Sequence, residues 1–292
     1  KSRLIIFKLK ALPTEGFLFL MQRILSYYRY FNLLSLDVAI GATISALFLT
    51  KIFEVDFRMQ GLLCLGLTVW LIYTMDHLVD ASKLKNQAST ERHRFHQRNF
   101  KAILVLAVVI LLMIIPLLFF IYKPVLSMGI GLGILVVIYF IVQRKLSFLK
   151  EFLGAMLYSV GVMLPVIALS ELSYNSLIAI PSILFFNTAL INLVLFSWFD
   201  RDKDKLDNHP SLVTSVGDKT SKGILYFLFA FQMAVFIYAF GAGMSYLMLL
   251  IFVAMYLVLL LIFVQSRWFA LNDRYRLAGD AVFLLPLIYL IH

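Results

Sequence analysis

Long apolar stretches alternate with short polar segments along almost the whole chain. Nine of these stretches are long enough to cross about 30 Å of hydrocarbon, which takes about 20 residues of helix. Open strands would leave backbone groups unpaired in lipid, so each stretch is expected to be helical. The pattern predicts an all-α, polytopic membrane protein, and its nine transmembrane helices are expected at residues 31–50, 61–79, 102–122, 125–142, 152–170, 178–199, 223–242, 244–265 and 277–291.

The chain is divided into two parts by this pattern. Residues 31–292 form the predicted nine-helix membrane domain. Residues 1–30 instead mix Phe, Leu and Tyr with cations such as Arg23 and Arg29. A helix of that composition lies in the membrane interface rather than across the bilayer. The first part is therefore predicted to be an interfacial segment on the cytoplasmic side.

Composition agrees with a membrane protein. Hydrophobic residues make up 62% of the chain, and the mean hydropathy is +0.92, values that exclude an ordinary soluble globular domain. Cys64, the only cysteine, lies within an apolar stretch, so no disulfide framework is expected.

The positive charge is distributed unevenly between the two predicted faces. Of the 26 Lys and Arg residues, 23 fall in the N-terminal segment and in the loops that share its side, and only Lys51, Arg58 and Lys123 fall on the other. The positive-inside rule then places the N-terminus in the cytoplasm and the C-terminus on the far side. The net charge of +10 is therefore explained by membrane topology, and no nucleic-acid partner is expected.

Two pairs of aspartates stand at the ends of predicted helices. Asp76 and Asp80 end the second stretch, and Asp200 and Asp204 end the sixth. Each pair has i,i+4 spacing, which places both carboxylates on one helical face about 6 Å apart. The topology puts both pairs on the cytoplasmic side, so all four carboxylates are expected to converge at one mouth.

Four gathered carboxylates require cations, because like charges would otherwise drive protons onto some of them. Oxygen-only ligands favour Mg²⁺, which shares its coordination with substrate phosphates. The alternative is that each pair merely ends a helix in a solvated, charged loop. The basic residues that follow the pairs suit phosphate oxygens, but positive-inside loops are basic in any membrane protein.

Other polar residues allow further interpretations. His77, His93 and His96 are close in sequence, yet a histidine-rich di-iron site needs more histidines than the five present, so an interfacial loop is the preferred interpretation. Asp37 and Asp280 lie within predicted spans. Intramembrane carboxylates usually face a cavity or a partner, so Asp37 is a candidate for lining the site, with a structural role as the alternative.

The chain resembles the UbiA superfamily of intramembrane prenyltransferases, as a divergent member. The resemblance rests on Asp76 and Asp80, on the run from Phe199 to Asp207 that contains Asp200 and Asp204, and on Arg92 after the first motif. A third similarity is the step from Tyr139 through Arg144 to Gly154. It covers residues 31–291 and implies a UbiA-like bundle of nine helices.

The departures from the family pattern are systematic. Ile72 and Phe196 stand one turn before the two motifs, where the family usually carries Asn. An Asn there would share the helical face of the carboxylates and could bind metal or phosphate. Asn208 and Leu212 replace the Gly and Thr that commonly follow the second motif.

The resemblance implies Mg²⁺-dependent transfer of a prenyl group from an isoprenyl diphosphate to a membrane-soluble aromatic or lipid acceptor. Its implied metal ligands and catalytic residues are Asp76, Asp80, Asp200 and Asp204. Its implied diphosphate-binding residues are Arg92, Arg144 and Lys205, and its implied cavity residues are Asp37, Ile72, Tyr139 and Phe196. Alternatives are a terpene cyclase of the same fold, a degenerate protein that binds isoprenoid lipid or acts as a scaffold, and a carboxylate-coupled transporter. The transporter is disfavoured because the acidic pairs lie at an interface rather than mid-membrane.

Overall fold

A computed structural model describes residues 23, 26–83, 88–143, 147–170 and 176–291. These described residues form helices joined by short connections, without any strand. Helices pair their backbone groups internally, which is the arrangement that lipid requires. The predicted all-α membrane fold is confirmed.

Among the described residues, seven helices are long and apolar enough to cross a membrane. Their bounds are α3 (Met59–Lys83), α5 (Phe100–Leu118), α6 (Lys123–Val142), α7 (Lys150–Leu169), α8 (Ser176–Leu206), α10 (Asp218–Gly241) and α11 (Tyr246–Val264). Helix α3 and helix α8 continue past the ends of their apolar stretches and carry the aspartate pairs in their last turns.

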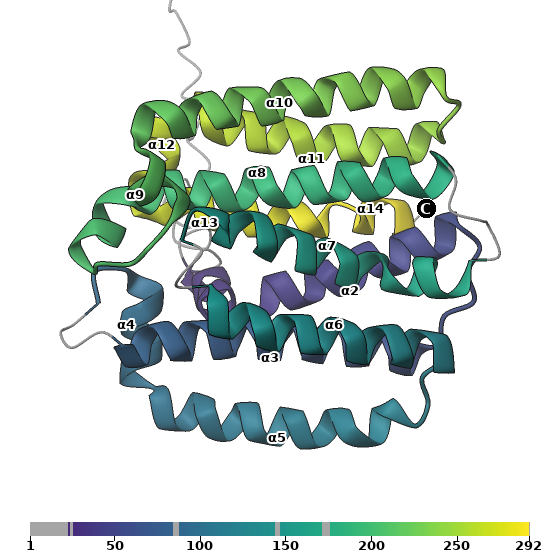
Figure 1. The fold of residues 1–292 in the computed structure, drawn as a ribbon, viewed down its shortest axis with the longest axis horizontal. Coiled ribbons are helices and arrows are strands. Elements are labelled where there is room, and N and C mark those ends of the chain that lie inside the picture. The colour runs from purple at the N-terminus through teal and green to yellow at the C-terminus, as the bar shows by residue number, and fades with distance from the viewer. Residues whose placement is uncertain (1–22, 24–25, 84–87, 144–146, 171–175, 292) are drawn as a thin grey trace, which may run out of the picture.

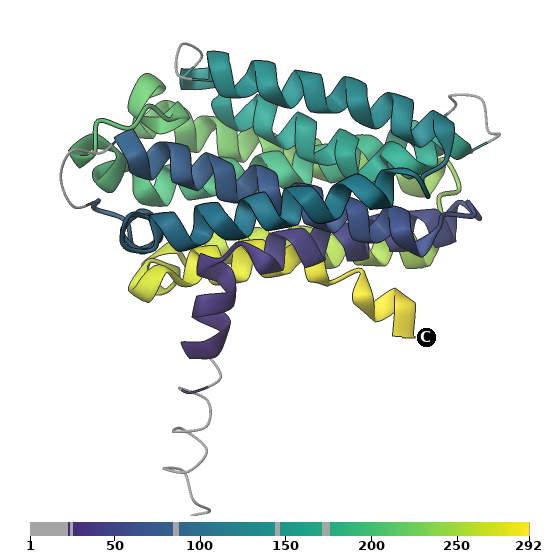
Figure 2. The ribbon, with the colours of Figure 1, turned by 90° about the horizontal axis from the view of Figure 1, so that it is seen from below.

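An eighth candidate span is broken near its start. Helix Ser26–Leu33 and α2 (Leu36–Ile52) qualify only together, and the chain bends by 79° between them. Ser35 adopts a left-handed conformation at the bend, with φ 55°. The Trp70 indole donates a 2.8 Å hydrogen bond to the Leu34 carbonyl, which pairs a carbonyl released by the break. In Figure 2 the purple N-terminal helix projects away from the bundle that α2 joins.

The predicted ninth span is not a continuous helix. Residues 277–291 are divided among α13 (Arg274–Ala281), the 3-10 turn η3 (Val282–Leu284) and α14 (Leu287–Ile291). Pro286 lies between the last two and has no N–H for a helical hydrogen bond. All three segments pack along α2. The described part of the chain thus has seven or eight candidate spans, and the count of nine stays a prediction.

Short helices gather at one end of the bundle. There α4 (Glu91–Arg98) follows α3, and α9 (Leu212–Val216) follows α8, on the left in Figure 1. The remaining short elements are η1 (Ser147–Leu149), α12 (Ser266–Phe269) and η2 (Leu271–Asp273). The Ser89 hydroxyl donates a 2.7 Å hydrogen bond to Asp207, which ties the connection after α3 to the connection after α8. Both aspartate pairs therefore lie at the same end of the molecule.

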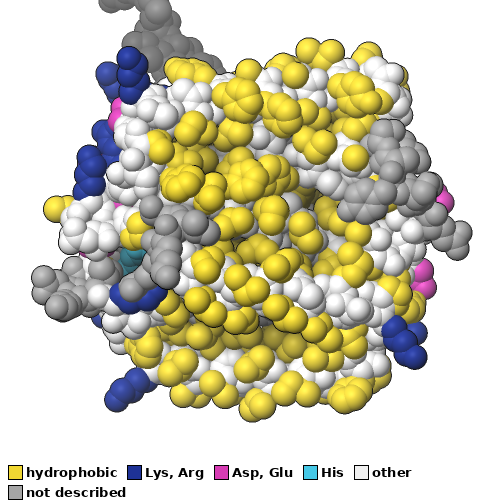
Figure 3. Space-filling model, viewed as in Figure 1, with side chains coloured by type: hydrophobic (Ala, Val, Ile, Leu, Met, Phe, Trp, Pro, Cys, Tyr) yellow, Lys and Arg dark blue, Asp and Glu magenta, His cyan; other side chains and the backbone are white. Residues whose placement is uncertain are grey.

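Apolar side chains cover the sides of the bundle, and charged side chains gather at its two ends (Figure 3). Helices α5 and α6 are the most outward-facing, with 17% and 11% of their apolar windows buried. Side chains that face lipid must be apolar because charge is costly there. The protein is an integral, multi-pass membrane protein.

The side that each end of the bundle faces can be tested by cysteine labelling. In a Cys64→Ala background, cysteines at the exposed positions Arg98 and Lys205 should react only from the cytoplasmic side, because their end carries most of the cations. A cysteine at Lys123, exposed at the opposite end, should react only from outside. The reverse pattern would show that the orientation is inverted.

Candidate functional site

A cavity of about 430 Å³ runs through the bundle between α3, α6, α7, α8 and α13. Its wall on α3 extends from Gly61 to Asp80, a distance of about 28 Å at a rise of 1.5 Å per residue. One end is reached by carboxylates, and the other by apolar residues such as Phe57 and Leu118. The cavity therefore joins a polar end to a long apolar arm.

The four motif aspartates all line this cavity. Asp80, Asp200 and Asp204 are buried, with exposed fractions of 8%, 2% and 7%, and Asp76 is half-buried. Helices α3 and α8 place each pair on one face through the i,i+4 spacing. Carboxylates at solvated helix ends would be exposed, so this burial disfavours the loop interpretation of the pairs.

Asp80 lies beside two lysines and a histidine. Lys150, the first residue of α7, places its Nζ 3.4 Å from Asp80 Oδ2. His209 Nε2 lies 3.7 Å from the same oxygen, and Lys83 Nζ lies 3.8 Å from Oδ1. Lys150 also donates to His209 Nε2 at 3.0 Å, so that imidazole nitrogen is an acceptor.

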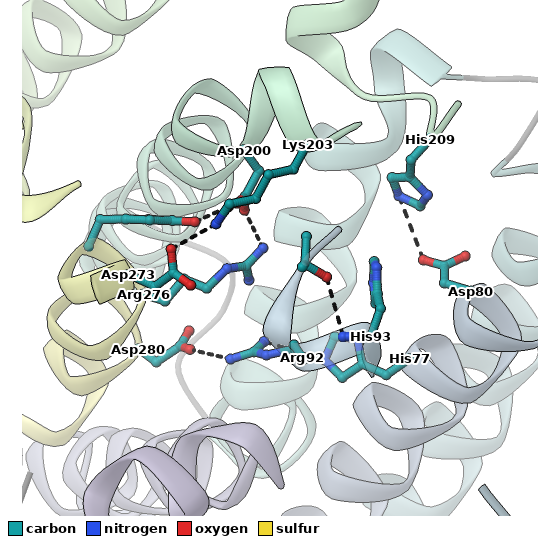
Figure 4. A network of polar contacts seen from close by, with 12 residues as sticks. His77, Asp80, Arg92, His93, Asp200, Lys203, His209, Asp273, Arg276 and Asp280 are labelled. Carbon is teal, nitrogen blue, oxygen red and sulfur yellow. Dashed lines mark hydrogen bonds and ion pairs between the residues drawn. The ribbon is translucent and has the colours of Figure 1, made fainter. Parts of the chain in front are cut away.

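Asp200 has a separate set of partners that come from α13 and α8. Arg276 forms an ion pair with Asp200 Oδ2, and the Tyr275 hydroxyl donates to Oδ1. Lys203 Nζ lies 3.5 Å from Asp200 and 2.8 Å from Asp273. Figure 4 shows Asp200 with Lys203, Asp273 and Arg276 on one side of the site, and Asp80 with His209 on the other.

Asp76 and Asp204 have hydrogen-bond partners rather than ion-pair partners. The Gln143 amide donates to Asp76 Oδ1 at 3.3 Å, and Ser211 donates a hydrogen bond to Asp204. Neither carboxylate forms an ion pair with the residues that the structure describes. These two carboxylates therefore have the greatest capacity to bind an additional cation.

Arg92 lines the cavity but is already engaged by the protein. Its guanidinium donates to Asp280 at 3.2 Å, to the Asn32 side chain at 3.0 Å and to His77 Nε2 at 3.3 Å. Asn32 donates in turn to Asp37 at 2.5 Å. Asp37 is fully buried but is not among the residues that line the cavity. It supports this polar network behind the wall.

The other sequence candidates occupy different environments. Ile72, Tyr139 and Phe196 line the cavity, and Phe196 packs beneath the Arg276 guanidinium at 5.1 Å. Lys205 is exposed and is not part of the lining. Arg144 lies outside the described residues.

Phe196 also shows why α13 carries a glycine. A Cβ on Gly279 would lie 2.7 Å from the Phe196 ring and 2.3 Å from Asn192 Oδ1. Contacts this short exclude a side chain at position 279 unless its neighbours move. Gly279 thus allows α13 to approach α8 closely, which brings Arg276 to Asp200.

The histidines next to the carboxylates are mostly buried. Burial lowers the pKa of His93 to about 4, an effect that the nearby Asp80 charge opposes, so this imidazole is neutral at pH 7. Burial also lowers the pKa of His96. In the described part of the chain, no three His, Cys, Asp or Glu side chains are arranged as ligands of one metal ion.

Several residues of the site were not identified as site candidates from the sequence. Lys150 and Arg276 are the cations that contact Asp80 and Asp200, and His209 and Tyr275 complete the two groups. His209 follows the second motif by only five residues, which is a usable signal. Nothing in the local sequence connects Arg276 with Asp200, because that contact depends on how α13 packs.

Comparisons with known proteins concern the fold. No family model and no curated protein matches the chain. The apo structure of a UbiA homologue from Aeropyrum pernix K1 is similar with a TM-score of 0.61 and 14% identity, covering 89% of this chain and 98% of that one. A UbiA homologue from Archaeoglobus fulgidus bound to DMAPP and Mg²⁺ has a TM-score of 0.61 and 13% identity over 89% and 98% of the two chains. A digeranylgeranylglyceryl phosphate synthase has a TM-score of 0.54 and 13% identity over 89% and 96%.

Proposed function

Because the chain has the fold of the UbiA superfamily, we propose that it transfers a prenyl group from an isoprenyl diphosphate to an acceptor within the membrane, in a Mg²⁺-dependent reaction. One observation carries the proposal: four aspartates from two helices line the polar end of a long apolar cavity. A prenyl diphosphate has the same division into a charged head and an apolar tail. The structural neighbour from Archaeoglobus fulgidus was solved with such a molecule and Mg²⁺.

The donor atoms at the polar end fit Mg²⁺, although they are not arranged around a preformed metal site. Mg²⁺ binds proteins through one or two carboxylates together with substrate phosphates and water. Asp76 and Asp204 would hold it first, since Asp80 and Asp200 contact Lys150 and Arg276. When bound, Mg²⁺ supplies positive charge that neutralises the diphosphate leaving group.

The chain's own cations suit the same leaving group. Lys150 and Arg276 are held in the cavity wall by carboxylates, so they are positioned before a ligand arrives. Preorganised cations aimed at developing negative charge stabilise it strongly where water is excluded. In this proposal they replace Arg144 and Lys205 as the principal diphosphate-binding residues.

A second candidate function is binding of an isoprenoid lipid without turnover. It is favoured by the internal ion pairs of Asp80 and Asp200 and by the apolar Ile72 and Phe196 beside the motifs. A third possibility, cyclisation of the donor, needs no acceptor. The three candidate functions can be distinguished by the products that form when the protein is given the prenyl diphosphate without an acceptor.

The test is to incubate the purified protein with geranylgeranyl diphosphate, with Mg²⁺ or with EDTA, and to analyse the products by mass spectrometry. The proposal expects Mg²⁺-dependent release of diphosphate that is accelerated by an added acceptor. A cyclic hydrocarbon from the donor alone would favour the cyclase. Tight binding with no product under any condition would favour the lipid-binding alternative.

Replacing Lys150 distinguishes two roles for this residue: binding of the diphosphate and neutralisation of Asp80. Lys150→Gln should weaken binding of the prenyl diphosphate by about tenfold or more, because a charge-assisted hydrogen bond contributes about 1.5–3 kcal/mol. The matched control is Lys222→Gln, whose partner Asp218 lies outside the cavity. If Lys150 only neutralises Asp80, its removal should instead strengthen Mg²⁺ binding and leave the diphosphate affinity unchanged.

A further inference from the structure

Asp280 of α13 is a buried carboxylate of the cavity that the diphosphate chemistry proposed above does not use. It is 4% exposed and belongs to the cavity lining. Asn32 donates to its Oδ2 at 2.8 Å, and Arg92 donates to the same oxygen at 3.2 Å. Oδ1 accepts no hydrogen bond from the described residues and is not sealed within the protein, so it is open to the cavity. Figure 4 shows one oxygen of Asp280 joined to Arg92 and the other without a partner.

A second buried carboxylate lies behind Asp280. Asp37 is fully buried, and the same Asn32 amide nitrogen donates to its Oδ2 at 2.5 Å. One nitrogen therefore bridges the two carboxylates. The Tyr28 hydroxyl lies 3.4 Å from Asp37 Oδ2, but a neutral hydroxyl adds no charge. In the described part of the chain, Arg92 is the one cation that forms an ion pair with either carboxylate.

The network has one negative charge in excess when both carboxylates are ionised, because Arg92 supplies a single positive charge. His77 Nε2 lies 3.3 Å from Arg92 Nη1. Arginine can only donate, so this nitrogen accepts and the imidazole is neutral. Arg276 of the same helix forms its ion pair with Asp200. Like charges in a buried site drive a proton onto one of them, and one proton would make the network neutral.

The other groups around Asp280 cannot supply the missing charge. The charge of Asp280 acts on side chains from the N-terminal helix, α2, α3, α7 and its own helix, which are Tyr28, Asp37, Tyr73, Tyr158 and Arg276. The three tyrosines are neutral at physiological pH. Among the described residues, the carboxylates of Asp37 and Asp280 are therefore the groups that can hold the proton.

Asp280 also lies at the depth where the chemistry is expected. Arg276 marks the diphosphate end of the cavity, because it contacts Asp200. Asp280 is four residues further along α13, so it lies on the same helical face about 6 Å deeper. A prenyl diphosphate bound at the motif aspartates would place its first carbon near this level.

We propose that Asp280 accepts the proton that the acceptor loses during prenyl transfer, and that it shares this proton with Asp37. The inference rests on the proposed function, because it assigns a catalytic residue to that reaction. The bond between the first prenyl carbon and the diphosphate oxygen breaks, and the diphosphate leaves with the electron pair. The acceptor forms a bond to that carbon with its own electron pair, and its proton moves to Asp280 Oδ1. An acceptor that reacts through O–H, N–H or C–H releases one proton in each case, so the role does not depend on the acceptor class.

The proton site can be tested without any substrate. Dicyclohexylcarbodiimide is an apolar reagent to which a protonated carboxyl group adds across the C=N bond, and mass spectrometry of peptides locates the adduct. Asp280 should be modified, and the modification should decrease as the pH is raised. Asp37, which does not line the cavity, should stay unmodified. No modification of Asp280, or modification that does not depend on pH, would overturn the proton site.

Asp37→Asn is the decisive variant for a shared proton. It removes the excess negative charge and leaves Asp280 with Arg92 as a balanced pair. Modification of Asp280 near neutral pH should therefore decrease by at least about tenfold. The control is Asp218→Asn, because Asp218 is exposed and lies outside the cavity, and it should leave the modification unchanged. Equal modification in the wild type and in Asp37→Asn would show that the two carboxylates share no proton.

Turnover tests the catalytic role. Diphosphate release from geranylgeranyl diphosphate is measured with Mg²⁺ and with water as the acceptor, and the wild-type rate should rise with pH as Asp280 loses its proton. Asp280→Asn should lower the rate by about a hundredfold, within the usual contribution of a general base, and should remove this pH dependence. Its Kd for the donor should change by less than about threefold, since Asp280 does not contact the diphosphate. Asp280→Glu should restore part of the rate and the pH dependence, which a purely structural role would not predict.

The outcomes separate this inference from the proposed function. Modification of Asp280 that responds to Asp37→Asn, without binding of the donor, would reject prenyl transfer and the catalytic role and keep the proton site. Donor binding with a rate and pH profile that Asp280→Asn leaves unchanged would reject the proton acceptor and keep the proposed function. The departing diphosphate would then be the group that takes the proton.

Discussion

Replacing Asp76 and Asp200 is expected to remove most of the Mg²⁺-dependent binding of a prenyl diphosphate, and the two losses should not add. Each single variant should weaken binding by about a hundredfold, because each removes a carboxylate charge from a shared centre. Groups that act as a unit show grossly non-additive effects. The measurement is the dissociation constant of geranylgeranyl diphosphate with Mg²⁺ for Asp76→Asn, Asp200→Asn and the combination.

Asparagine is preferable to alanine at position 200. Asp200 is 2% exposed and contacts Arg276 and Tyr275, so an apolar replacement would leave the half-buried Arg276 guanidinium without this partner, which is destabilising. Asp218→Asn is a matched control, because Asp218 contacts a cation, Arg201, but does not line the cavity. Additive losses would indicate two separate sites. Unchanged binding in folded variants would favour a function without metal-bound diphosphate.

Most helices could be predicted from the sequence because lipid imposes a simple rule on it. A span must be apolar for about 20 residues and must pair its own backbone. The same rule predicts the positions of the helix ends less accurately. Helix α3 continues to Lys83 and helix α8 to Leu206, past the point where the apolar stretch ends, because charged residues at the interface can still be helical.

The breaks in the first and last predicted spans could not be read from hydropathy. The bend at Ser35 depends on contacts made by Trp70 and on the polar network of Asn32 and Asp37. Trp70 comes from α3, and the network around Asn32 is completed by Arg92 and Asp280 from distant segments. Pro286 is a visible signal in the last span, but Pro116, Pro165 and Pro181 lie inside continuous helices. Proline alone therefore does not predict where a membrane helix stops.

The aspartates and their shared end could be predicted, whereas their partners could not. Spacing within one helix is fixed by its periodicity, and topology brings helix ends to one face. The contacts of Lys150 and Arg276 depend on packing between distant segments. Arg92 illustrates the difference: its place beside the first motif could be predicted, and it lines the cavity, whereas its ion pair with Asp280 depends on how the distant α13 packs.

The apolar arm of the cavity should determine the length of prenyl chain that the protein binds. Gly129 and Gly133 of α6 line the cavity, and a Cβ added at either position meets no atom within 4 Å. Gly133 is ten residues from Gln143, whose amide contacts Asp76, which places it about 15 Å from the carboxylates along the helix. A side chain at this position would project into the arm without displacing the helix.

Gly133→Phe should therefore weaken binding of geranylgeranyl diphosphate by at least about tenfold and leave dimethylallyl diphosphate nearly unaffected. The longer chain must pass position 133. Each Å² of its apolar surface that the new side chain keeps out of the cavity costs about 25 cal/mol of binding free energy. The shorter donor ends well before it. Gly131→Phe is the matched control, because Gly131 lies on the same helix with open space around it but outside the cavity lining. Equal losses for both donors would indicate a general disturbance of α6. No loss for either would show that the prenyl tail leaves the carboxylates by another path, between α7 and α8 rather than along α3 and α6.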